Sequence, residues 1–308
     1  MIRRRAVTSN DMWRGGLAGR GSRADNGPVP DDAPPQQPIE LAPKATARPP
    51  RVGGEVVLRP EADGAIDAML ADVYLHASNC VRAFGDFHVA IGATAGVETA
   101  LVRLLYDLNY RDFPWSRTRL WMTQECGTDG RGEGWPVLEG TVVAQSGMPV
   151  EQAHRIDLSL PAPSEEYERQ LREHLGWRPK GHDRLDLVLA TIDEEGNLPW
   201  ATHHGAEDGA LCVEWTGPDG RARAGLTPFV VGACRCVCVL AVGSGVRGAI
   251  TRLEAAQRGG PLVPGQSLRA TGGDVRWYVD YEACPSFRAG GKADPGAESG
   301  PSTSERTG

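Results

Sequence analysis

Hydrophobic and polar positions follow two different periods along the middle of the chain. Apolar residues spaced like one face of a helix predict helices at Ala62–Arg82, Val97–Asn109, Ser164–Leu175 and Val246–Gln257. Short apolar runs between them, typical of strands buried on both faces, lie at 87–91, 119–122, 185–190, 235–242 and 275–279. Strands that alternate with helices indicate βαβ units, so we predict an α/β fold with a doubly wound, mostly parallel sheet and helices on both faces. The runs at 185–190 and 237–241 are expected to be its central strands.

Local signals add detail to this outline. Ser164 is expected to be the N-cap of its helix, because two glutamates follow it in the first turn and Gly176 stands beyond the last. The runs Cys212–Trp215 and Ala222–Thr227 flank the turn sequence Gly217–Gly220, which predicts a hairpin inserted between the βαβ units.

The two ends of the chain differ from its middle. Residues 1–54 are rich in proline and arginine and residues 286–308 in Gly, Ser, Pro and charge, so we expect disordered tails around one folded domain at 55–285. The net charge of −7 disfavours a general nucleic-acid binder. No window holds the roughly 18 consecutive apolar residues of a membrane span. The arginine-rich start is compatible with organelle targeting, but a disordered extension or a start codon called too early is the stronger interpretation, and we expect a cytoplasmic protein.

The seven cysteines form no C-x-x-C pair. Cys234, Cys236 and Cys238 alternate within one apolar run, so in a strand they would project to one face. Neighbours on one strand converge poorly on a metal ion, and we interpret them as small core residues with no metal. An odd number of cysteines fits a reducing compartment.

Several motifs occur in one order along the chain. Asp186–Leu189 and Gly196 match the pattern D-L-V-L-L-G-M-G-x-D-G-H, Phe87–Ile91 matches F-H-V-A-L, and Met148–Ile156 matches I-P-x-E-N-V-H-R-I. Over roughly 230 residues the chain resembles the 6-phosphogluconolactonase / glucosamine-6-phosphate isomerase family. The resemblance implies a cofactor-free enzyme that hydrolyses 6-phospho-D-glucono-1,5-lactone in the pentose phosphate pathway.

The catalytic loop departs from that family. Its catalytic histidine falls on Asn197 and its preceding acid on Glu195. An imidazole can take a proton from the attacking water, whereas an amide cannot. Loss of a general base typically costs about 10²–10⁴ in rate. His203 and His204 lie six and seven residues further along and could supply a relocated base, although adjacent loop histidines are more often solvated.

The phosphate-binding signals are also altered. The family's S-G-G-S-T-P becomes a turn containing Gly92, Thr94 and Gly96, which could cradle phosphate with backbone N–H groups or simply connect a strand to a helix. Arg247 stands at the family's G-x-x-K lysine and Arg223 lies near a family arginine, so both are candidate phosphate contacts. We expect Thr94 and Arg247 to face one cleft.

The family's D-E-R segment reads Thr123–Glu125, so Glu125 replaces a cation with an anion that a bound phosphosugar would feel if it faced the pocket. Three altered loops leave two functions open. One is a lactonase with weak or lost activity, and the other is a noncatalytic relative that binds a phosphosugar or a protein partner. An amino-sugar-phosphate deaminase is a third, less favoured interpretation.

Overall fold

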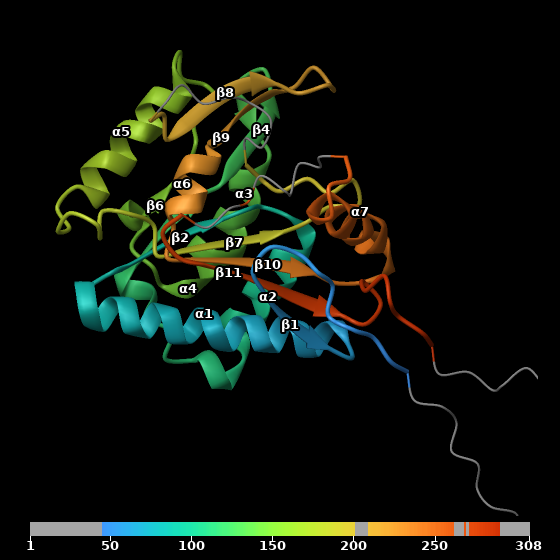
Figure 1. Cartoon of the computed structure of the whole chain (residues 1–308). Helices are drawn as coiled ribbons and strands as arrows, with labels where there is room; N and C mark the ends of the chain where they lie inside the picture. Colours follow the sequence, from blue (N-terminus) through green and yellow to red (C-terminus); the bar gives the residue numbers. More distant parts are fainter. Residues whose placement is uncertain (1–44, 201–208, 262–267, 269–270, 290–308) are drawn as a thin grey trace, which may run out of the picture. The chain divides into compact units, whose positions relative to one another are not determined.

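The computed structural model describes residues 45–200, 209–261, 268 and 271–289 (Figure 1). Among these residues, seven strands form one sheet in the order β1-β11-β10-β7-β2-β3-β6, and every neighbouring pair is parallel. The strands are β1 (Glu55–Arg59), β2 (Phe87–Ile91), β3 (Thr118–Met122), β6 (Ala153–His154), β7 (Leu187–Thr191), β10 (Cys236–Ala241) and β11 (Asp274–Asp280). The predicted parallel α/β sheet is confirmed, with β7 and β10 central and buried.

The predicted helices are also confirmed within a few residues. They are α1 (Ala62–Phe84), α2 (Ala95–Tyr106), α5 (Pro163–Leu175) and α7 (Arg247–Gln257). Shorter helical segments not predicted from the sequence are α3 (Gly134–Leu138), which runs through a π-helical turn at Glu139–Val143 into α4 (Ala144–Ser146), and α6 (Pro228–Ala233). In Figure 1, α1 runs beneath the strands of the parallel sheet.

The start of α5 differs from the sequence prediction. The helix begins at Pro163 with Ala162 as its N-cap, so the expectation of a Ser164 cap was wrong. The backbone N–H and the hydroxyl of Ser164 both donate to the carboxylate of Glu214, at 3.0 and 2.7 Å. A tertiary acceptor from the neighbouring sheet thus replaces the local cap.

A second, smaller sheet is antiparallel. Its described strands run in the order β5-β4-β9-β8, with β4 (Gln124–Thr128), β5 (Arg131–Gly132), β8 (Cys212–Thr216) and β9 (Ala222–Leu226). The β8–β9 pair is the predicted hairpin. Strand β4 follows β3 after a single residue, Thr123, so the chain passes directly from the parallel sheet into the second one. Figure 1 shows this second sheet above the carboxyl-end loops of the parallel strands.

Cys234, Cys236 and Cys238 are buried core residues, as expected. All seven cysteines lie in the described part of the chain and are free thiols. Cys236 and Cys238 are fully buried on β10 with their sulfur atoms 3.7 Å apart, so they do project to one face. No group of three or more potential ligand side chains in the described residues could hold a metal ion.

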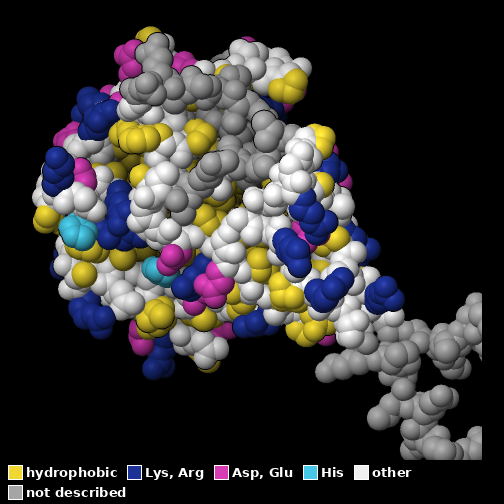
Figure 2. Space-filling view, in the orientation of Figure 1, with side chains coloured by type: hydrophobic (Ala, Val, Ile, Leu, Met, Phe, Trp, Pro, Cys, Tyr) yellow, Lys and Arg dark blue, Asp and Glu magenta, His cyan; other side chains and the backbone are white. Residues whose placement is uncertain are grey.

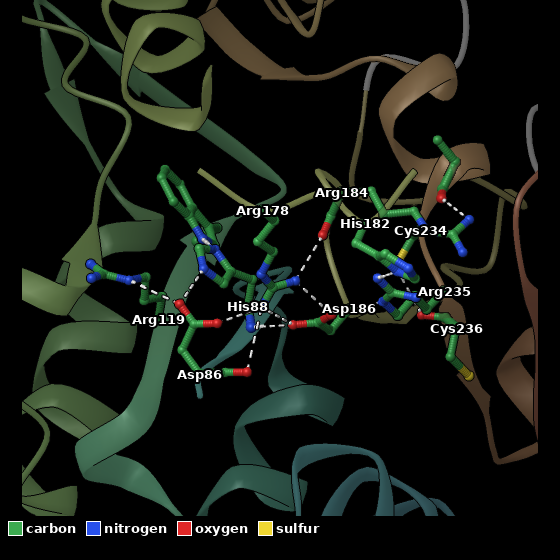
Figure 3. A network of polar contacts seen from close by, with 12 residues as sticks. Asp86, His88, Arg119, Arg178, His182, Arg184, Asp186, Cys234, Arg235 and Cys236 are labelled. Carbon is green, nitrogen blue, oxygen red and sulfur yellow. Dashed lines mark hydrogen bonds and ion pairs between the residues drawn. The ribbon is translucent and has the colours of Figure 1, made fainter. Parts of the chain in front are cut away.

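A buried ionic network fixes the amino ends of the central strands (Figure 3). The Arg178 guanidinium donates to both carboxylate oxygens of Asp186 at 2.9 Å and to Asp86 at 2.6 Å. Asp186 also accepts the backbone N–H of His88 at 2.8 Å, which ties the start of β7 to β2. The motif aspartate therefore has a structural partner set at the edge of the sheet opposite the carboxyl ends of its strands.

The domain boundaries predicted from the sequence remain predictions. Thr46 forms an antiparallel pair with Arg288, and the Trp277 indole donates to the carbonyl of Gly53 at 2.8 Å. The chain is therefore packed a few residues beyond 55–285 at both ends. Within the described residues, none of the helices has the length and apolar character to cross a bilayer.

Candidate functional site

A cavity of about 470 Å³ lies where the carboxyl ends of β2 and β7 face the antiparallel sheet. In open α/β sheets this end of the strands is the usual ligand site. The described lining residues are Thr94, Gln124, Thr191, Asp193, Asn197, Leu198, Pro199, Trp200, Trp215, Thr216, Pro218 and Arg223. Three residues chosen from the sequence, Thr94, Asn197 and Arg223, thus come together from three separate segments.

The turn from β2 into α2 forms one wall. The Thr94 hydroxyl lies 2.7 Å from the Thr191 hydroxyl at the end of β7, and both residues line the cavity. The N–H of Gly92 donates to Leu189 and that of Thr94 to Gly92, so these two donors are already used within the protein. Donors for a ligand would instead come from the first turn of α2, where helix N–H groups lack intrahelical acceptors.

The two glycines of this turn are explained by close packing. A Cβ atom on Gly92 would lie 2.6 Å from the Pro199 ring, and one on Gly96 would lie 2.9 Å from the Thr191 methyl group. Gly92 therefore allows the loop that carries Asn197 to approach the end of β2. The predicted small-residue turn shapes the cavity through its missing side chains.

Asn197 is held by Asp193 at the opposite wall. Its backbone N–H and its side-chain amide donate to the two carboxylate oxygens of Asp193, at 2.6 and 2.8 Å. Both residues line the cavity, whereas Glu195 is exposed and does not. His203 and His204 lie outside the described residues. The loop therefore presents an amide and a carboxylate where the family pattern has a histidine.

Arg223 supplies the positive charge. It projects from β9, and its Nη2 donates to Asp219 at 2.8 Å. Its Nε is buried and has no hydrogen-bond partner among the described residues. Asp193 and Arg223 are the charged side chains in the described lining; Asp193 lies in the loop after β7, and Arg223 lies on β9 of the antiparallel sheet.

Arg247 does not reach this cavity. Its Nε donates to the carbonyl of Glu282 at 2.7 Å, and its guanidinium lies 5.4 Å from the centre of the Phe287 ring. The expectation that Thr94 and Arg247 face one cleft is therefore not met. The position matches the family lysine in sequence, but the local carbonyl and ring hold the longer arginine side chain elsewhere.

Glu125 does not face the cavity either. It is 1% exposed and accepts hydrogen bonds from the backbone N–H groups of Cys126, Glu133, Gly134 and Trp135 at 2.7–3.1 Å. The carboxylate thus caps the start of α3, where negative charge is favourable. Its charge is satisfied by the backbone, so it does not repel a ligand in the way that the altered motif suggested.

Sequence reasoning missed several lining residues. Asp193 stands where the family pattern has glycine, and this mismatch could have marked Asp193 as a candidate site residue. Trp200 and Trp215 come from a loop and a hairpin whose placement over β7 depends on tertiary structure. Trp200 is 2% exposed, and its indole N–H has no hydrogen-bond partner among the described residues. The tryptophans add apolar, aromatic residues to the lining, and Trp215 is the cross-strand neighbour of Arg223.

Solved structures with this architecture have low sequence identity to the chain. The 6-phosphogluconolactonase of Thermotoga maritima is 19% identical, with a TM-score of 0.61 over 73% of this chain and 99% of that one. The enzyme of the same name from Trypanosoma brucei is 13% identical, with a TM-score of 0.59 over 75% and 98%. A monomeric glucosamine-6-phosphate deaminase of the NagB superfamily is 13% identical, with a TM-score of 0.57 over 74% and 97%. Neither a protein-family model nor a curated protein sequence matches the chain.

These likenesses place the chain in the fold class shared by sugar-phosphate lactonases and deaminases. Within that class it has the 6-phosphogluconolactonase fold, as its motif order predicted. At such identities the likeness establishes the fold, and the activity has to be argued from the cavity.

Proposed function

We propose that this protein binds a phosphosugar, or the lactone of one, in the cavity between the two sheets. We further propose that it hydrolyses 6-phosphogluconolactone weakly or not at all. The observation that carries the proposal is the gathering of Thr94, Asn197 and Arg223 around one cavity at the carboxyl ends of the central strands. The neighbours of the same fold named above are lactonases and a deaminase of phosphosugars.

The lining suits both ends of such a ligand. The Arg223 guanidinium is a charged donor for phosphate oxygens. The hydroxyls of Thr94 and Thr191 bond to each other, so the one that accepts in that pair can also donate to the ligand. The partly exposed ring of Trp215 offers a flat apolar surface for the C–H face of a sugar ring. Binding needs only these groups, and all of them belong to the described lining.

Hydrolysis needs a group that accepts a proton from water. Both carboxylate oxygens of Asp193 are already occupied by donors from Asn197, and Asn197 itself cannot take a proton. Its amide is moreover committed to Asp193 as a donor. Loss of a general base raises the barrier by about 3–5 kcal/mol. A cytoplasmic location is part of this proposal, because seven free thiols suit a reducing compartment.

Binding is tested by calorimetry with 6-phosphogluconate. We expect Arg223→Ala to weaken binding about tenfold, since it removes a charge-assisted contact. Arg247→Ala is the matched control, because it also removes one arginine but lies outside the cavity. No binding by the parent protein, or equal weakening by both variants, would show that the cavity is not the phosphosugar site.

Catalysis is tested by a lactonase assay from which spontaneous hydrolysis is subtracted. We expect a rate at least about 10²-fold below that of an intact enzyme. Asn197→His alone should restore little, because the turn at Gly92–Gly96 and the Thr123–Glu125 segment are altered as well. A parent rate equal to that of an intact enzyme would contradict this half of the proposal and make His203→Ala and His204→Ala the next variants.

A further inference from the structure

A second cavity, of about 500 Å³, lies beside the end of α7, and three of its seven described lining residues are arginines. Its described lining is Arg48, Pro49, Arg51, Glu254, Arg258, Pro285 and Ser286. Three arginines and one glutamate make this site strongly positive in a chain whose net charge is −7. Figure 2 shows Lys and Arg side chains gathered over the region that Figure 1 labels α7.

The backbone of residues 46–51 is fastened in place beside α7. The N–H of Arg48 donates to the Ser286 hydroxyl at 2.8 Å, and that hydroxyl donates back to the carbonyl of Arg48 at 3.1 Å. The N–H of Arg51 donates to Glu254 at 2.6 Å. Together with the pairing of Thr46 and Arg288, these bonds fix the backbone from which the side chains of Arg48 and Arg51 extend on one side of the cavity.

The guanidinium groups here are largely uncompensated. Within the described residues, those of Arg48 and Arg51 have neither a hydrogen-bond nor an ion-pair partner, and Arg258 has only a 3.7 Å contact with Glu254. The single carboxylate is also engaged by the backbone of Arg51. Elsewhere in the described chain, arginines such as Arg103 and Arg169 each pair with two acids. The cavity therefore holds charge that the described residues do not neutralise.

We propose that this cavity is a second anion site, which takes a small ligand carrying two or more phosphate groups. Planar guanidinium groups bind phosphate oxygens in pairs, and several of them around one concavity favour a multiply charged ligand over a single carboxylate. The site lies at the end of α7 opposite Arg247 and shares no lining residue with the cavity that contains Thr94 and Arg223. It stands independently of the proposed phosphosugar function.

The test is calorimetry of the full-length chain with inorganic pyrophosphate at constant ionic strength. The double variant Arg48→Ala/Arg51→Ala should weaken binding about tenfold, because each exposed charge contributes a few-fold and the two effects multiply. The matched control Arg111→Ala/Arg117→Ala removes the same charge from exposed positions elsewhere and should leave the affinity unchanged. Glu254→Gln should tighten binding about threefold, because it removes the carboxylate and keeps an oxygen for the N–H of Arg51.

Three outcomes would overturn the proposal. The first is no binding of pyrophosphate by the parent protein at concentrations up to about 10 mM. The second is equal weakening by the two double variants, which would mean general attraction to surface charge. The third is displacement of pyrophosphate by an equally charged oligoglutamate at the same concentration, which would indicate an acidic peptide as the ligand. Loss of 6-phosphogluconate binding in Arg223→Ala with pyrophosphate binding intact would separate the two cavities.

Discussion

At the scale of single residues, the effect of each departure from the motif pattern depends on what the side chain contacts in the folded protein. Glu125 looked like a charge reversal in a ligand loop, but it is buried under four backbone N–H donors. Arg247 looked like a preserved phosphate contact, but a carbonyl and an aromatic ring take its guanidinium. Asn197 does line the cavity, so the loss of the histidine has a consequence for chemistry.

Replacement of Glu125 should measure its capping role. Glu125→Ala would take this acceptor from the N–H groups of Cys126, Gly134 and Trp135, while the Glu133 N–H keeps the Cys126 carbonyl, and we expect it to lower the free energy of unfolding by about 2–4 kcal/mol. Glu125→Gln keeps one oxygen, which can serve most of these donors, so its cost should be about 1–2 kcal/mol. Urea denaturation measures both. Glu139→Ala, at an exposed position nearby, should change stability by less than about 0.5 kcal/mol, and an equal effect of all three variants would rule out the capping role.

At the scale of elements, the cavity depends on how closely two loops meet. The β2–α2 turn approaches the 193–200 loop at Gly92, and Thr94 contacts the end of β7 through Thr191. The antiparallel sheet then closes the other side with Arg223 and Trp215. The cavity therefore requires both the missing side chain of Gly92 and the hairpin that the sequence predicted.

Gly92→Ala should disturb this arrangement. Its added Cβ atom would lie 2.6 and 2.9 Å from the Pro199 ring carbons, so the Asn197 loop must move. We expect a loss of about 1–3 kcal/mol of stability and weaker binding of 6-phosphogluconate in calorimetry. Gly140→Ala is the control, because a Cβ atom there meets nothing within 4 Å and alanine favours the helical backbone. Unchanged ligand affinity in Gly92→Ala would show that the loop contact does not shape the binding site.

At the scale of the whole molecule, buried neutral histidines make the stability of the fold depend on pH. The Trp121 indole donates to Nδ1 of His88 at 3.1 Å, so the Nε2 of His88 carries the proton that it shares with Asp86 at 3.0 Å. Burial lowers the pKa of His88. His154 stacks on Trp121 at 3.9 Å, and burial together with the nearby His174 lowers its pKa to about 3. Both rings are neutral in the folded protein at neutral pH.

Acid should therefore destabilise the fold before the carboxylates titrate. An unfolded histidine binds its proton near pH 6.5, whereas folded His154 does so only near pH 3. The stability that these neutral rings contribute is present above pH 6.5 and is lost as the pH falls toward 3. We expect the urea midpoint to decrease between pH 6.5 and 4.5, and His154→Phe, which keeps the stacked ring, to make that decrease smaller. An identical pH dependence in the variant would mean that His154 does not titrate on unfolding.

The sequence alone determined the order of the βαβ units, the four long helices and the two central strands. These features depend on local periodicity and on burial of uniformly apolar runs, and both are readable from neighbouring residues. It also selected Thr94, Asn197 and Arg223, because their motifs sit at fixed places on those elements. The short strand β4 escaped prediction, since its residues Gln124–Thr128 lack an apolar run and pair only because β9 lies beside them.

Tertiary structure alone decided which selected side chains share a cavity. The side chain of Arg247 is oriented by the carbonyl of Glu282, and Glu125 is buried by its contacts with the backbone at the start of α3. Neither set of contacts can be predicted from the local sequence pattern. The basic cavity beside α7 is likewise invisible in the sequence, because its arginines come from residues 48–51 and from Arg258, some 200 positions apart. Side-chain environment is set by contacts between elements, so it emerges only when the elements are packed.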